Sequence, residues 1–317
     1  MTKRCLYCYR PLEDETAEYH TACSRKFFGS PVPPALDMSN AQMQELAKGI
    51  VLRSVAVTGV QPKLSLTIEN SAGDPKKSRF TIVGLWGNFI LKPPSPEFTA
   101  LPENEDLTMH LSSFFDLPTA AHSLIRLQSG ELAYITKRFD RIKDGKLALE
   151  DMCQVTETLT ENKYRSSMEK VGKAIAQYSL QPGLDALRFF ELTLFCFLTG
   201  NADMHLKNFS LLTTAEGETM LSPAYDLLCT ALAMPDDKDE LALTLNARKR
   251  KLKSTDFPAF ARNLKIPDKA VEHTIARFKK RLAGVNELID ISFLPSEMKS
   301  DYKEIIQQRA RQSGLFV

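Results

Sequence analysis

The sequence predicts an α+β fold with two lobes, a small mixed β lobe followed by a larger helical lobe. Short runs of strand-forming residues, separated by turn signals, occupy the first half of the chain, whereas helical periodicity dominates from about residue 151. The length of 317 residues suits two lobes, because a domain usually takes about 100–200 residues. We therefore expect an N-terminal segment over 1–34, the small lobe over 35–150 and the helical lobe over 151–317.

The small lobe is expected to be an antiparallel sheet. Turn signals at Ala72-Gly73-Asp74 and Trp86-Gly87-Asn88 separate its early strands, and a linker rich in Gly and Pro over 29–34 leads into it. Helices are predicted over 40–50 and 103–115. The strands are predicted at 54–58, 64–68, 80–83, 89–91, 122–127 and 132–138.

The helical lobe is predicted from a stripe of apolar residues with helical spacing. Large apolar side chains recur every three to four positions from Leu187 to Leu198, and this helix is expected to stop at Gly200. A hairpin is expected next, with strands at 209–213 and 218–221. The remainder, from about 255 to 316, is predicted to be helical.

Charge and composition exclude some classes of function. The formal net charge of +2 gives no electrostatic argument for binding nucleic acid or an anionic membrane. No stretch approaches the ~20 apolar residues of a membrane span, and no apolar core of a signal peptide follows Met1. We expect a cytoplasmic protein without sequence-specific DNA binding. The basic run 248–253 is interpreted as a solvated loop, with a contact to DNA or an acidic partner as the alternative.

Residues 200–208, Gly-Asn-Ala-Asp-Met-His-Leu-Lys-Asn, carry the side chains expected of a phosphotransferase loop. Asp203 and Asn208 have the separation of the aspartate and asparagine in the protein-kinase loop H-R-D-x-x-x-x-N. Phosphoryl transfer needs a carboxylate to orient the attacking hydroxyl, and further oxygen ligands to hold Mg²⁺. Lys207 is placed to reach the transferring phosphate, and Asp226 is the candidate second metal ligand. The alternative for Asp203, His205 and Asn208 is a polar turn with capping side chains.

Two earlier segments supply candidate phosphate-binding groups. Lys92 ends a predicted strand, and Glu105 in the following helix could pair with it, as a strand lysine and a helix glutamate do in protein kinases. Thr58-Gly59-Val60-Gln61-Pro62-Lys63 lies between two strands, where a glycine lets the backbone approach a phosphate. Each has an ordinary alternative, because most lysines are solvated surface charges and a single glycine also suits a plain hairpin turn.

Taken together, these segments resemble the kinase core of HipA-like proteins, the toxins of bacterial toxin–antitoxin pairs. The most specific matches are Glu150-Asp151-Met152-Cys153-Gln154 and the Asp-x-His-x-Lys-Asn pattern over 203–208. The resemblance spans residues 55–230 and implies the two-lobed, protein-kinase-like HipA fold. The matching segments, in chain order, are Thr58–Lys63, Ile90–Pro93, Asn104-Glu105, Arg138–Arg141, Glu150–Gln154, Asp203–Ser210 and Pro223–Asp226.

The resemblance assigns nucleotide-binding roles. It implies that the segment 59–63 is the phosphate-binding loop and that Lys92 contacts the nucleotide phosphates. The hinge that receives adenine would run through 137–139, with Gln154 as a supporting residue. The residues expected to bind the nucleotide are Thr58, Gly59, Val60, Gln61, Lys63, Lys92, Glu105, Lys137, Phe139 and Gln154.

The resemblance also assigns the catalytic and metal-binding roles. It implies that Asp203 is the catalytic base and that His205 orients the loop. Asn208 and Asp226 would hold Mg²⁺, and Lys207 completes the catalytic set.

Two departures from the family pattern are visible. Full-length HipA carries a further N-terminal subdomain before the phosphate loop, whereas the residues before position 55 look different here. This chain therefore resembles the split, HipT-like arrangement, in which a separate small protein supplies that subdomain. In addition, the position of the family's autophosphorylated serine is occupied by Ala56. Thr58, directly before Gly59, matches a second phosphorylatable position of HipT-type loops and is the candidate for autophosphorylation.

The resemblance implies an ATP- and Mg²⁺-dependent serine/threonine protein kinase that phosphorylates a protein target and itself. By family analogy the target is an aminoacyl-tRNA synthetase, and the kinase is a toxin neutralised by a helix-turn-helix antitoxin. A small protein like the N-terminal subdomain is a further expected partner. Two alternatives use the same residues: a catalytically weak, nucleotide-binding adaptor, and a phosphotransferase acting on a small-molecule alcohol.

The six cysteines divide into two groups. Cys5-x-x-Cys8 and His20-x-x-Cys23 offer four soft ligands in two close pairs, which suits a tetrahedral structural Zn²⁺ site. In a reducing compartment such a cluster indicates metal binding rather than disulfides. The alternative is a small packed cap of reduced thiols over the small lobe. The other three are isolated among apolar neighbours and are expected to be buried: Cys153, Cys196 and Cys229.

Overall fold

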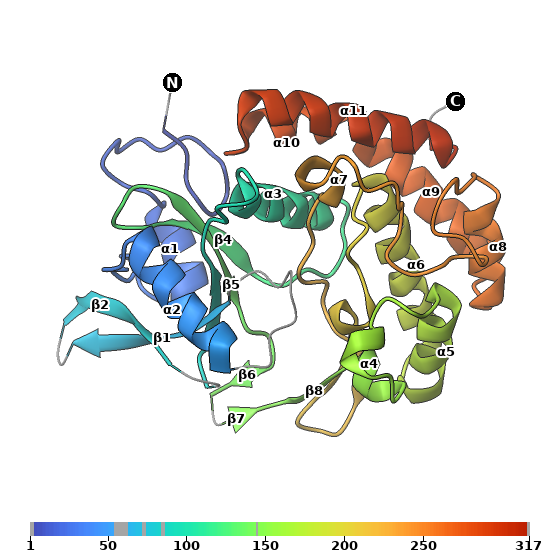
Figure 1. Ribbon diagram of the computed structural model, residues 1–317, viewed down its shortest axis with the longest axis horizontal. Coiled ribbons are helices and arrows are strands. Elements are labelled where there is room, and N and C mark those ends of the chain that lie inside the picture. The colour runs from blue at the N-terminus through green and yellow to red at the C-terminus, as the bar shows by residue number, and fades with distance from the viewer. Residues whose placement is uncertain (1–2, 54–62, 72–73, 84–85, 144, 316–317) are drawn as a thin grey trace. The chain divides into compact units, whose positions relative to one another are not determined.

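The chain divides into two compact units, each with its own sheet (Figure 1). The computed structural model describes residues 3–53, 63–71, 74–83, 86–143 and 145–315. The first unit has a larger share of strand and the second is mostly helical, so the predicted α+β class is confirmed. The predicted strand at 54–58 lies outside the described residues. The first unit comprises Met1–Asp106, Ala120–Phe139 and Ile291–Phe293, and the second comprises Leu107–Thr119, Asp140–Asp290 and Leu294–Val317.

The first unit is built on a five-stranded sheet in the order β2-β1-β3-β5-β4. Neighbouring strands are antiparallel throughout, as predicted. Leu64, Leu91 and Ile135 lie in register across the three central strands and are fully buried, so they form one row of the core. The strands are β1 (Leu64–Ser71), β2 (Asp74–Ile82), β3 (Phe89–Lys92), β4 (His122–Arg126) and β5 (Leu132–Lys137).

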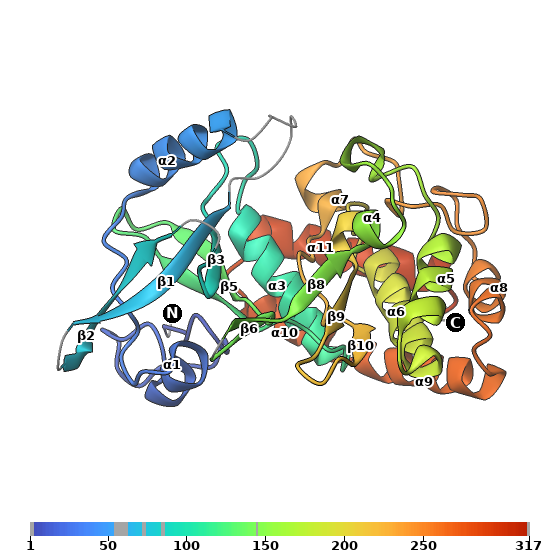
Figure 2. The ribbon, with the colours of Figure 1, turned by 90° about the horizontal axis from the view of Figure 1, so that it is seen from below.

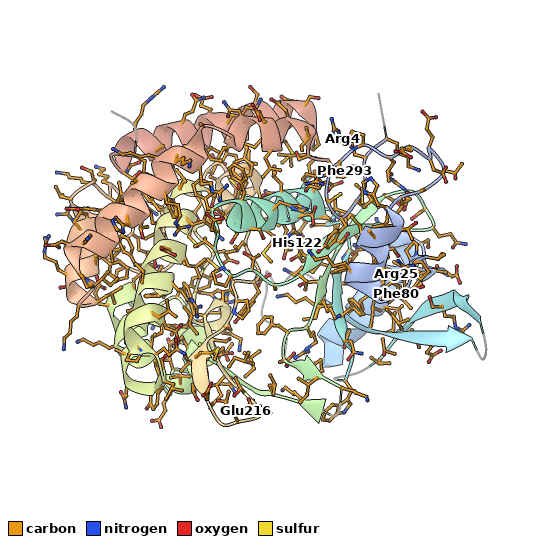
Figure 3. All side chains as sticks on the ribbon, turned by 180° about the vertical axis from the view of Figure 1, so that it is seen from behind. Arg4, Arg25, Phe80, His122, Glu216 and Phe293 are labelled. Atoms are coloured by element: carbon orange, nitrogen blue, oxygen red, sulfur yellow. The ribbon has the colours of Figure 1, made fainter. Side chains whose placement is uncertain are left out.

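Helix α1 (Thr21–Phe28) covers part of this sheet and was not expected from the sequence. Its short length gives a weak periodic signal, and it ends at Gly29, whose φ of 82° favours glycine. Phe27 packs against Phe89 with ring centroids 5.7 Å apart, and Phe28 packs against Phe80, labelled in Figure 3, at 5.9 Å. These aromatic contacts fasten the N-terminal segment to the sheet.

Two further segments complete the first unit. Helix α2 (Asn40–Arg53) agrees with the helix predicted over 40–50, and its Met43 is fully buried in the core of this unit. Residues 291–293 return to the unit near the end of the chain, where Phe293 packs edge-on against Tyr9 with centroids 5.3 Å apart (Figure 3).

The second unit contains a three-stranded antiparallel sheet in the order β10-β9-β8. The hairpin of β9 (Ser210–Thr213) and β10 (Thr219–Leu221) agrees with the predicted one. The third strand, β8 (Ala148–Asp151), was missed, because its Ala-Leu-Glu-Asp sequence is too short and too acidic to show an alternating pattern. A small hairpin of β6 (Arg141–Ile142) and β7 (Gly145–Lys146) precedes it.

Most of the second unit is helical, and its helices are labelled in Figure 2. Among the described residues, no helix is long and apolar enough to cross a membrane. α3 begins in the first unit and continues into the second. The helices are α3 (Leu101–Phe114), α4 (Met152–Val155), α5 (Met168–Tyr178), α6 (Pro182–Leu198), α7 (Thr230–Ala233), α8 (Asp256–Asn263), α9 (Asp268–Leu282), α10 (Val285–Ile291) and α11 (Ser296–Gln312), with short 3-10 turns η1 (Thr160–Asn162) and η2 (Leu206–Asn208).

Helix α6 forms the centre of the second unit. It begins with Pro182 in its first turn, and Phe189, Phe190 and Phe195 are fully buried on different sides of it. A helix that is apolar around most of its circumference is buried rather than amphipathic. It ends before Gly200, as predicted, and the loop that follows carries the candidate catalytic residues.

The basic run 248–253 is irregular, with Arg248, Arg250, Lys251 and Lys253 exposed and Leu252 buried. Arg250 Nε lies 2.5 Å from the Asp239 carboxylate, and Arg248 lies 3.9 Å from that of Asp256. Part of its charge is therefore matched by acids of the same chain.

Candidate functional site

Asp203 lies in a loop whose backbone is fixed by three hydrogen bonds. The Asp203 amide donates to Asn201 Oδ1 at 3.0 Å. Its carbonyl oxygen accepts from the Asn208 side-chain amide at 3.0 Å and from the His205 backbone amide at 2.8 Å. Asn208 is buried, so its bond to Asp203 is shielded from water. The structure thus brings Asp203 and Asn208 together, and the loop presents the Asp203 carboxylate in a set direction.

Helix α7 holds the start of this loop. The Thr230 hydroxyl accepts from the Ala202 amide at 2.8 Å and donates to the Gly200 carbonyl at 3.0 Å. The Ala231 amide also donates to the Gly200 carbonyl, at 3.1 Å. Thr230 is buried, and it stands too far along the chain from Asp203 for spacing to have identified it.

Tyr164 contacts the Asp203 carboxylate directly. Its hydroxyl donates to Asp203 Oδ1 at 2.5 Å, and its ring lies edge-on to His205 with centroids 4.9 Å apart. Burial and this bond to Asp203 raise the pKa of Tyr164 well above its usual value, so it remains a donor at neutral pH. The sequence around Tyr164 has no motif or periodic pattern that would have pointed to this contact.

The carboxylates of Asp203 and Asp226 both act on His205. Burial lowers the pKa of the imidazole below its usual value, although both carboxylates raise it to a smaller extent. The imidazole is therefore neutral at neutral pH. Within the described part of the chain, its Nδ1 atom is buried without a hydrogen-bond partner. His205 thus stays neutral beside Asp203, whose carbonyl accepts from its backbone amide.

Asp226 has an unusual backbone conformation. Its φ is 60°, in the left-handed region that few non-glycine residues adopt. The preceding residues fix this position, since the Ala224 amide donates to the Pro118 carbonyl and the Ser222 amide to the Ser210 carbonyl. Such strain costs about 1–3 kcal/mol per residue and is concentrated at functional sites. Eight other described non-glycine residues, among them Asn246 and Lys251, also have a positive φ, so this conformation is not specific to Asp226.

Tyr225 connects the β9–β10 hairpin to the candidate catalytic loop. Its hydroxyl donates to the Lys207 carbonyl at 2.8 Å and accepts from the Ser210 hydroxyl at 2.6 Å. Burial raises the pKa of Tyr225, so the phenol keeps its proton. The residue next to Asp226 therefore holds the short turn η2, which carries Lys207 and Asn208.

Lys207 forms an ion pair with Asp151, at 2.8 Å. Asp151 caps helix α4, where its carboxylate accepts from the Gln154 amide and the Gln154 side-chain oxygen accepts from the Asp151 amide. The segment Glu150–Gln154 is thus positioned beside the candidate catalytic loop. The side-chain oxygen of Gln154, predicted to support the nucleotide, is used in this cap.

The first unit contains a buried ion pair between β3 and α3. Lys92 Nζ lies 2.5 Å from Glu105 Oε1, both side chains are almost fully buried, and the ammonium lies 5.4 Å from the centre of the Tyr134 ring. Burying two charges is costly unless they are well paired, so this is a specific arrangement rather than a surface contact. Lys92 is therefore not the solvated surface lysine of the alternative interpretation.

The other predicted nucleotide-binding residues are exposed, half-buried or undescribed. Lys63 and Lys137 are exposed, and Phe139 is half-buried at the end of the first unit. The Arg138 amide between them donates to the Asn88 carbonyl at 2.8 Å. Thr58, Gly59, Val60 and Gln61 lie outside the described residues.

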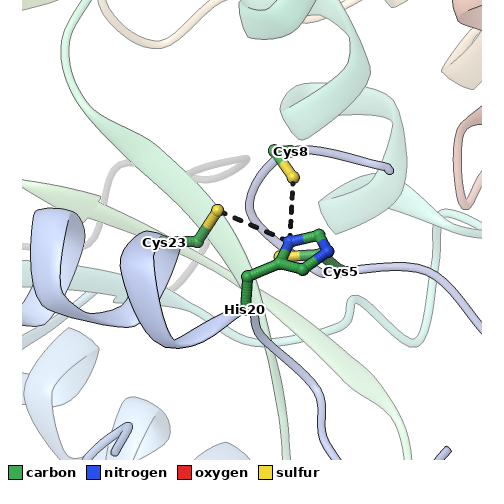
Figure 4. A group of neighbouring side chains, drawn as sticks. All are labelled: Cys5, Cys8, His20 and Cys23. Atoms are coloured by element: carbon green, nitrogen blue, oxygen red, sulfur yellow. Dashed lines mark hydrogen bonds between the residues drawn. The ribbon is translucent and has the colours of Figure 1, made fainter. Parts of the chain in front are cut away.

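The N-terminal cysteine and histidine side chains lie together in the first unit (Figure 4). The donor atoms of Cys5, Cys8, His20 and Cys23 are all within 4.8 Å of one another. The other three cysteines, Cys153, Cys196 and Cys229, are buried, as predicted.

Comparison with known proteins identifies the family. The model of the HipA-like C-terminal domain matches residues 55–285, well over half of the chain. The protein belongs to the HipA-like C-terminal domain family. The resemblance stated from the sequence is thereby confirmed.

Relatives with kinase names are 25–30% identical to this chain over the residues that align. It is 30% identical to "Putative kinase Y4dM" of Sinorhizobium fredii over 73% of this chain and 59% of that protein. It is 26% identical to a "Putative kinase" of Haemophilus influenzae over 77% of both. It is 25% identical to the serine/threonine-protein kinase toxin HipA of Shewanella oneidensis over 72% of this chain and 55% of that toxin. The chain thus spans about three fifths of the length of Y4dM.

Two solved structures share the fold. The Shewanella oneidensis HipA chain, in a complex of HipA, HipB and operator DNA, matches with a TM-score of 0.67 and 22% identity, covering 82% of this chain and 65% of that one. The Helicobacter pylori proinflammatory kinase CtkA matches with a TM-score of 0.51 and 16% identity, covering 71% and 86%. The predicted protein-kinase-like, HipA-like fold is confirmed.

Proposed function

We propose that this protein is an ATP- and Mg²⁺-dependent serine/threonine protein kinase of HipA type. The observation that carries the proposal is the hydrogen bond from the Asn208 side-chain amide to the Asp203 carbonyl, which brings the proposed base and a proposed metal ligand together in one loop. Family membership and relatives that carry kinase names support the same class of reaction.

Asp203 is proposed as the base. Tyr164 occupies its Oδ1 atom, and Oδ2 accepts no hydrogen bond from the residues that the structure describes, so Oδ2 can accept one from a substrate hydroxyl. In the transfer, the hydroxyl oxygen forms a bond to the γ-phosphorus while the bond from that phosphorus to the bridging oxygen breaks. The hydroxyl proton passes to Asp203, and the electron pair leaves with ADP.

Asn208 and Asp226 are proposed as the metal ligands. The Asn208 amide nitrogen donates to the Asp203 carbonyl, which leaves its side-chain oxygen as the end available to a cation. Amide and carboxylate oxygens are the hard ligands that Mg²⁺ prefers. Mg²⁺ bound there would neutralise charge on the phosphates.

The remaining assignments concern the nucleotide. Lys92, which is paired with Glu105, is proposed to contact the nucleotide phosphates. Lys207 is proposed to leave its ion pair with Asp151 and bind the transferring phosphate. The hinge over 137–139 is proposed for adenine, and the segment 58–63 for the phosphate loop. Thr58 is proposed as the site of autophosphorylation.

The physiological role is proposed from the relatives. HipA of Shewanella oneidensis is named a toxin, and its solved structure holds HipB and operator DNA. We propose that this kinase is likewise a toxin controlled by an antitoxin, with a small protein like the HipA N-terminal subdomain as a further partner. An aminoacyl-tRNA synthetase is the target that family analogy favours.

Phosphoproteomics after induced expression tests the proposed function. We expect new phosphoserine or phosphothreonine sites on one or a few proteins in cells that express the wild type, because a positioned base selects hydroxyl acceptors. Cells that express Asp203→Asn at the same level should lack them. Phosphate on Thr58 of the recovered wild-type chain would support autophosphorylation, and its absence there would remove that assignment. Equal phosphorylation with both variants would contradict the role of Asp203.

A further inference from the structure

Four metal-ligating side chains of the first unit have no role in the proposed phosphoryl transfer. Cys5 and Cys8 lie in the first loop of the chain, His20 directly precedes α1, and Cys23 lies in the first turn of that helix. Cys5 is fully buried and the other three are half-buried. Figure 4 shows the three sulfur atoms converging on one edge of the His20 ring.

The distances within this cluster agree with one bound cation. Cys8 Sγ lies 3.4 Å and Cys23 Sγ 3.7 Å from His20 Nδ1, and all four donor atoms are within 4.8 Å of one another. In a tetrahedral site with Zn–S of about 2.3 Å and Zn–N of about 2.0–2.1 Å, the sulfur–nitrogen edges are about 3.6 Å. The two measured edges lie on either side of that value.

The orientation of His20 also favours a metal. His20 Nε2 lies 2.9 Å from the Pro11 carbonyl oxygen, which can only accept, so Nε2 carries the proton. Nδ1 therefore presents its lone pair to the sulfurs. A histidine ligand whose second nitrogen donates to a backbone carbonyl is the usual arrangement around zinc.

A cap of reduced thiols explains the cluster less well. A single Nδ1 lone pair can accept one S–H bond, whereas three thiols gather around it. A thiol is also a weak donor, so a hydrogen bond from it would contribute little free energy to hold the three thiols together. One cation would instead satisfy all four donors at once.

The cluster joins segments that are attached to the sheet and to α3. The Leu6 carbonyl, beside Cys5, accepts from the Leu124 amide at 3.3 Å and from the Ser123 hydroxyl at 3.1 Å, which attaches this loop to β4. Tyr19, beside His20, donates to the Leu124 carbonyl at 2.5 Å. The residues next to both ligand pairs are therefore hydrogen-bonded to the same strand, β4.

A second connection runs from the cluster toward the buried ion pair. The hydroxyl of Tyr9, which follows Cys8, donates to Asp106 Oδ2 at 2.6 Å. Asp106 follows Glu105 on α3, and its other oxygen lies 2.7 Å from His122 Nδ1. The turn that contains Cys8 is thus linked to the helix end that presents Glu105 to Lys92.

We propose that Cys5, Cys8, His20 and Cys23 bind one Zn²⁺ that fixes the N-terminal segment against β4 and α3. Four protein ligands leave no open position for a substrate, so the ion is structural. The three thiols lose their protons to solvent when the ion binds. The zinc site would support the sheet that carries Lys92. Any effect of the site on phosphoryl transfer rests on the proposed kinase function, whereas the site itself does not.

Metal analysis of the purified full chain tests the site. We expect about one zinc per chain after purification under reducing conditions, and less than about a fifth of that in Cys8→Ser, because three ligands bind zinc far more weakly than four. The matched control is Cys153→Ser, which changes a buried cysteine of the second unit and should keep its zinc. Wild-type protein without zinc, or zinc that persists in Cys8→Ser, would overturn the proposal.

Cobalt substitution identifies the ligands in folded protein, and so does not depend on a variant that fails to fold. Wild-type chain stripped of metal and given Co²⁺ should develop thiolate-to-cobalt charge transfer and the intense visible bands of a tetrahedral ion. Zinc should then displace them. Absence of the charge-transfer band in a chain with a native circular dichroism spectrum would overturn the assignment. Neither readout needs kinase activity, so the zinc site and the proposed function can fail separately.

Discussion

At the level of single residues, Asp203 is defined as much by its neighbours as by its own position in the sequence. Its type and its spacing to Asn208 could be read from the chain, and so could the candidate role of Asp226. The contacts that orient it could not, because Tyr164 and Thr230 approach it only after the second unit has folded. Residue type predicts chemistry, whereas tertiary structure decides which oxygen of a carboxylate remains available.

Tyr164 is expected to be a positioning residue for Asp203. Tyr164→Phe removes the 2.5 Å bond and leaves the ring on His205, so Asp203 gains rotational freedom. We expect kcat to fall about tenfold, equal to about 1.4 kcal/mol in transition-state stabilisation, with little change in the KM for ATP. Initial rates over a range of ATP concentrations measure both constants.

The matched control is Tyr178→Phe, which removes the hydroxyl of an exposed tyrosine of the same unit. It should leave both constants unchanged. An unchanged kcat in Tyr164→Phe, or an effect on KM alone, would mean that the phenol does not orient the base.

At the level of secondary-structure elements, regular patterns were predicted and short elements were missed. The long apolar stripe of α6 and the turn-bounded strands of the first unit agree with the structure. α1 and β8 were not predicted, because a helix of eight residues and a strand of four owe their form to packing more than to local preference. The missed helix α1 carries Cys23 of the proposed zinc site, and the missed strand β8 carries Asp151, which pairs with Lys207. The contacts of these two side chains could therefore not be predicted from the sequence.

Gly200 connects α6 to the candidate catalytic loop and leaves little room for a side chain. Its φ is 65°, and an added Cβ would lie 3.0 Å from Ala231 Cβ and 3.0 Å from Ile305 Cγ2. We expect Gly200→Ala to lower the free energy of unfolding by about 1–2 kcal/mol for the left-handed backbone and by a further 1–3 kcal/mol or so for overpacking. Denaturant unfolding measures the total.

Gly217→Ala separates the two contributions. Gly217 also has a positive φ, 83°, but an added Cβ would meet nothing within 4 Å. It should therefore show only the backbone cost, and equal destabilisation of the two variants would show that packing against Ala231 does not fix the loop.

At the level of the whole molecule, the groups proposed to take part in phosphoryl transfer are divided between the two units. Lys92 and Glu105 belong to the first, and Asp203, Asn208 and Asp226 belong to the second. The order of strands and helices, together with motifs in the HipA order, was sufficient to predict the family and the fold. The sequence could not supply the contacts of each side chain or the identity of a substrate, because these depend on surfaces that residue spacing does not encode.

Transfer of labelled γ-phosphate from ATP to the chain itself and to an added acceptor protein is the most direct test of the proposed kinase. With Mg²⁺ present, the wild type should label a serine or threonine. Asp203→Asn should reduce the rate by about 10²–10⁴-fold, as expected for loss of a general base, while ATP still binds. Asp236→Asn, which changes an exposed aspartate of the same unit, should label at the wild-type rate. Undiminished labelling by Asp203→Asn, or no labelling by a wild type that binds ATP, would contradict the proposed phosphotransferase site.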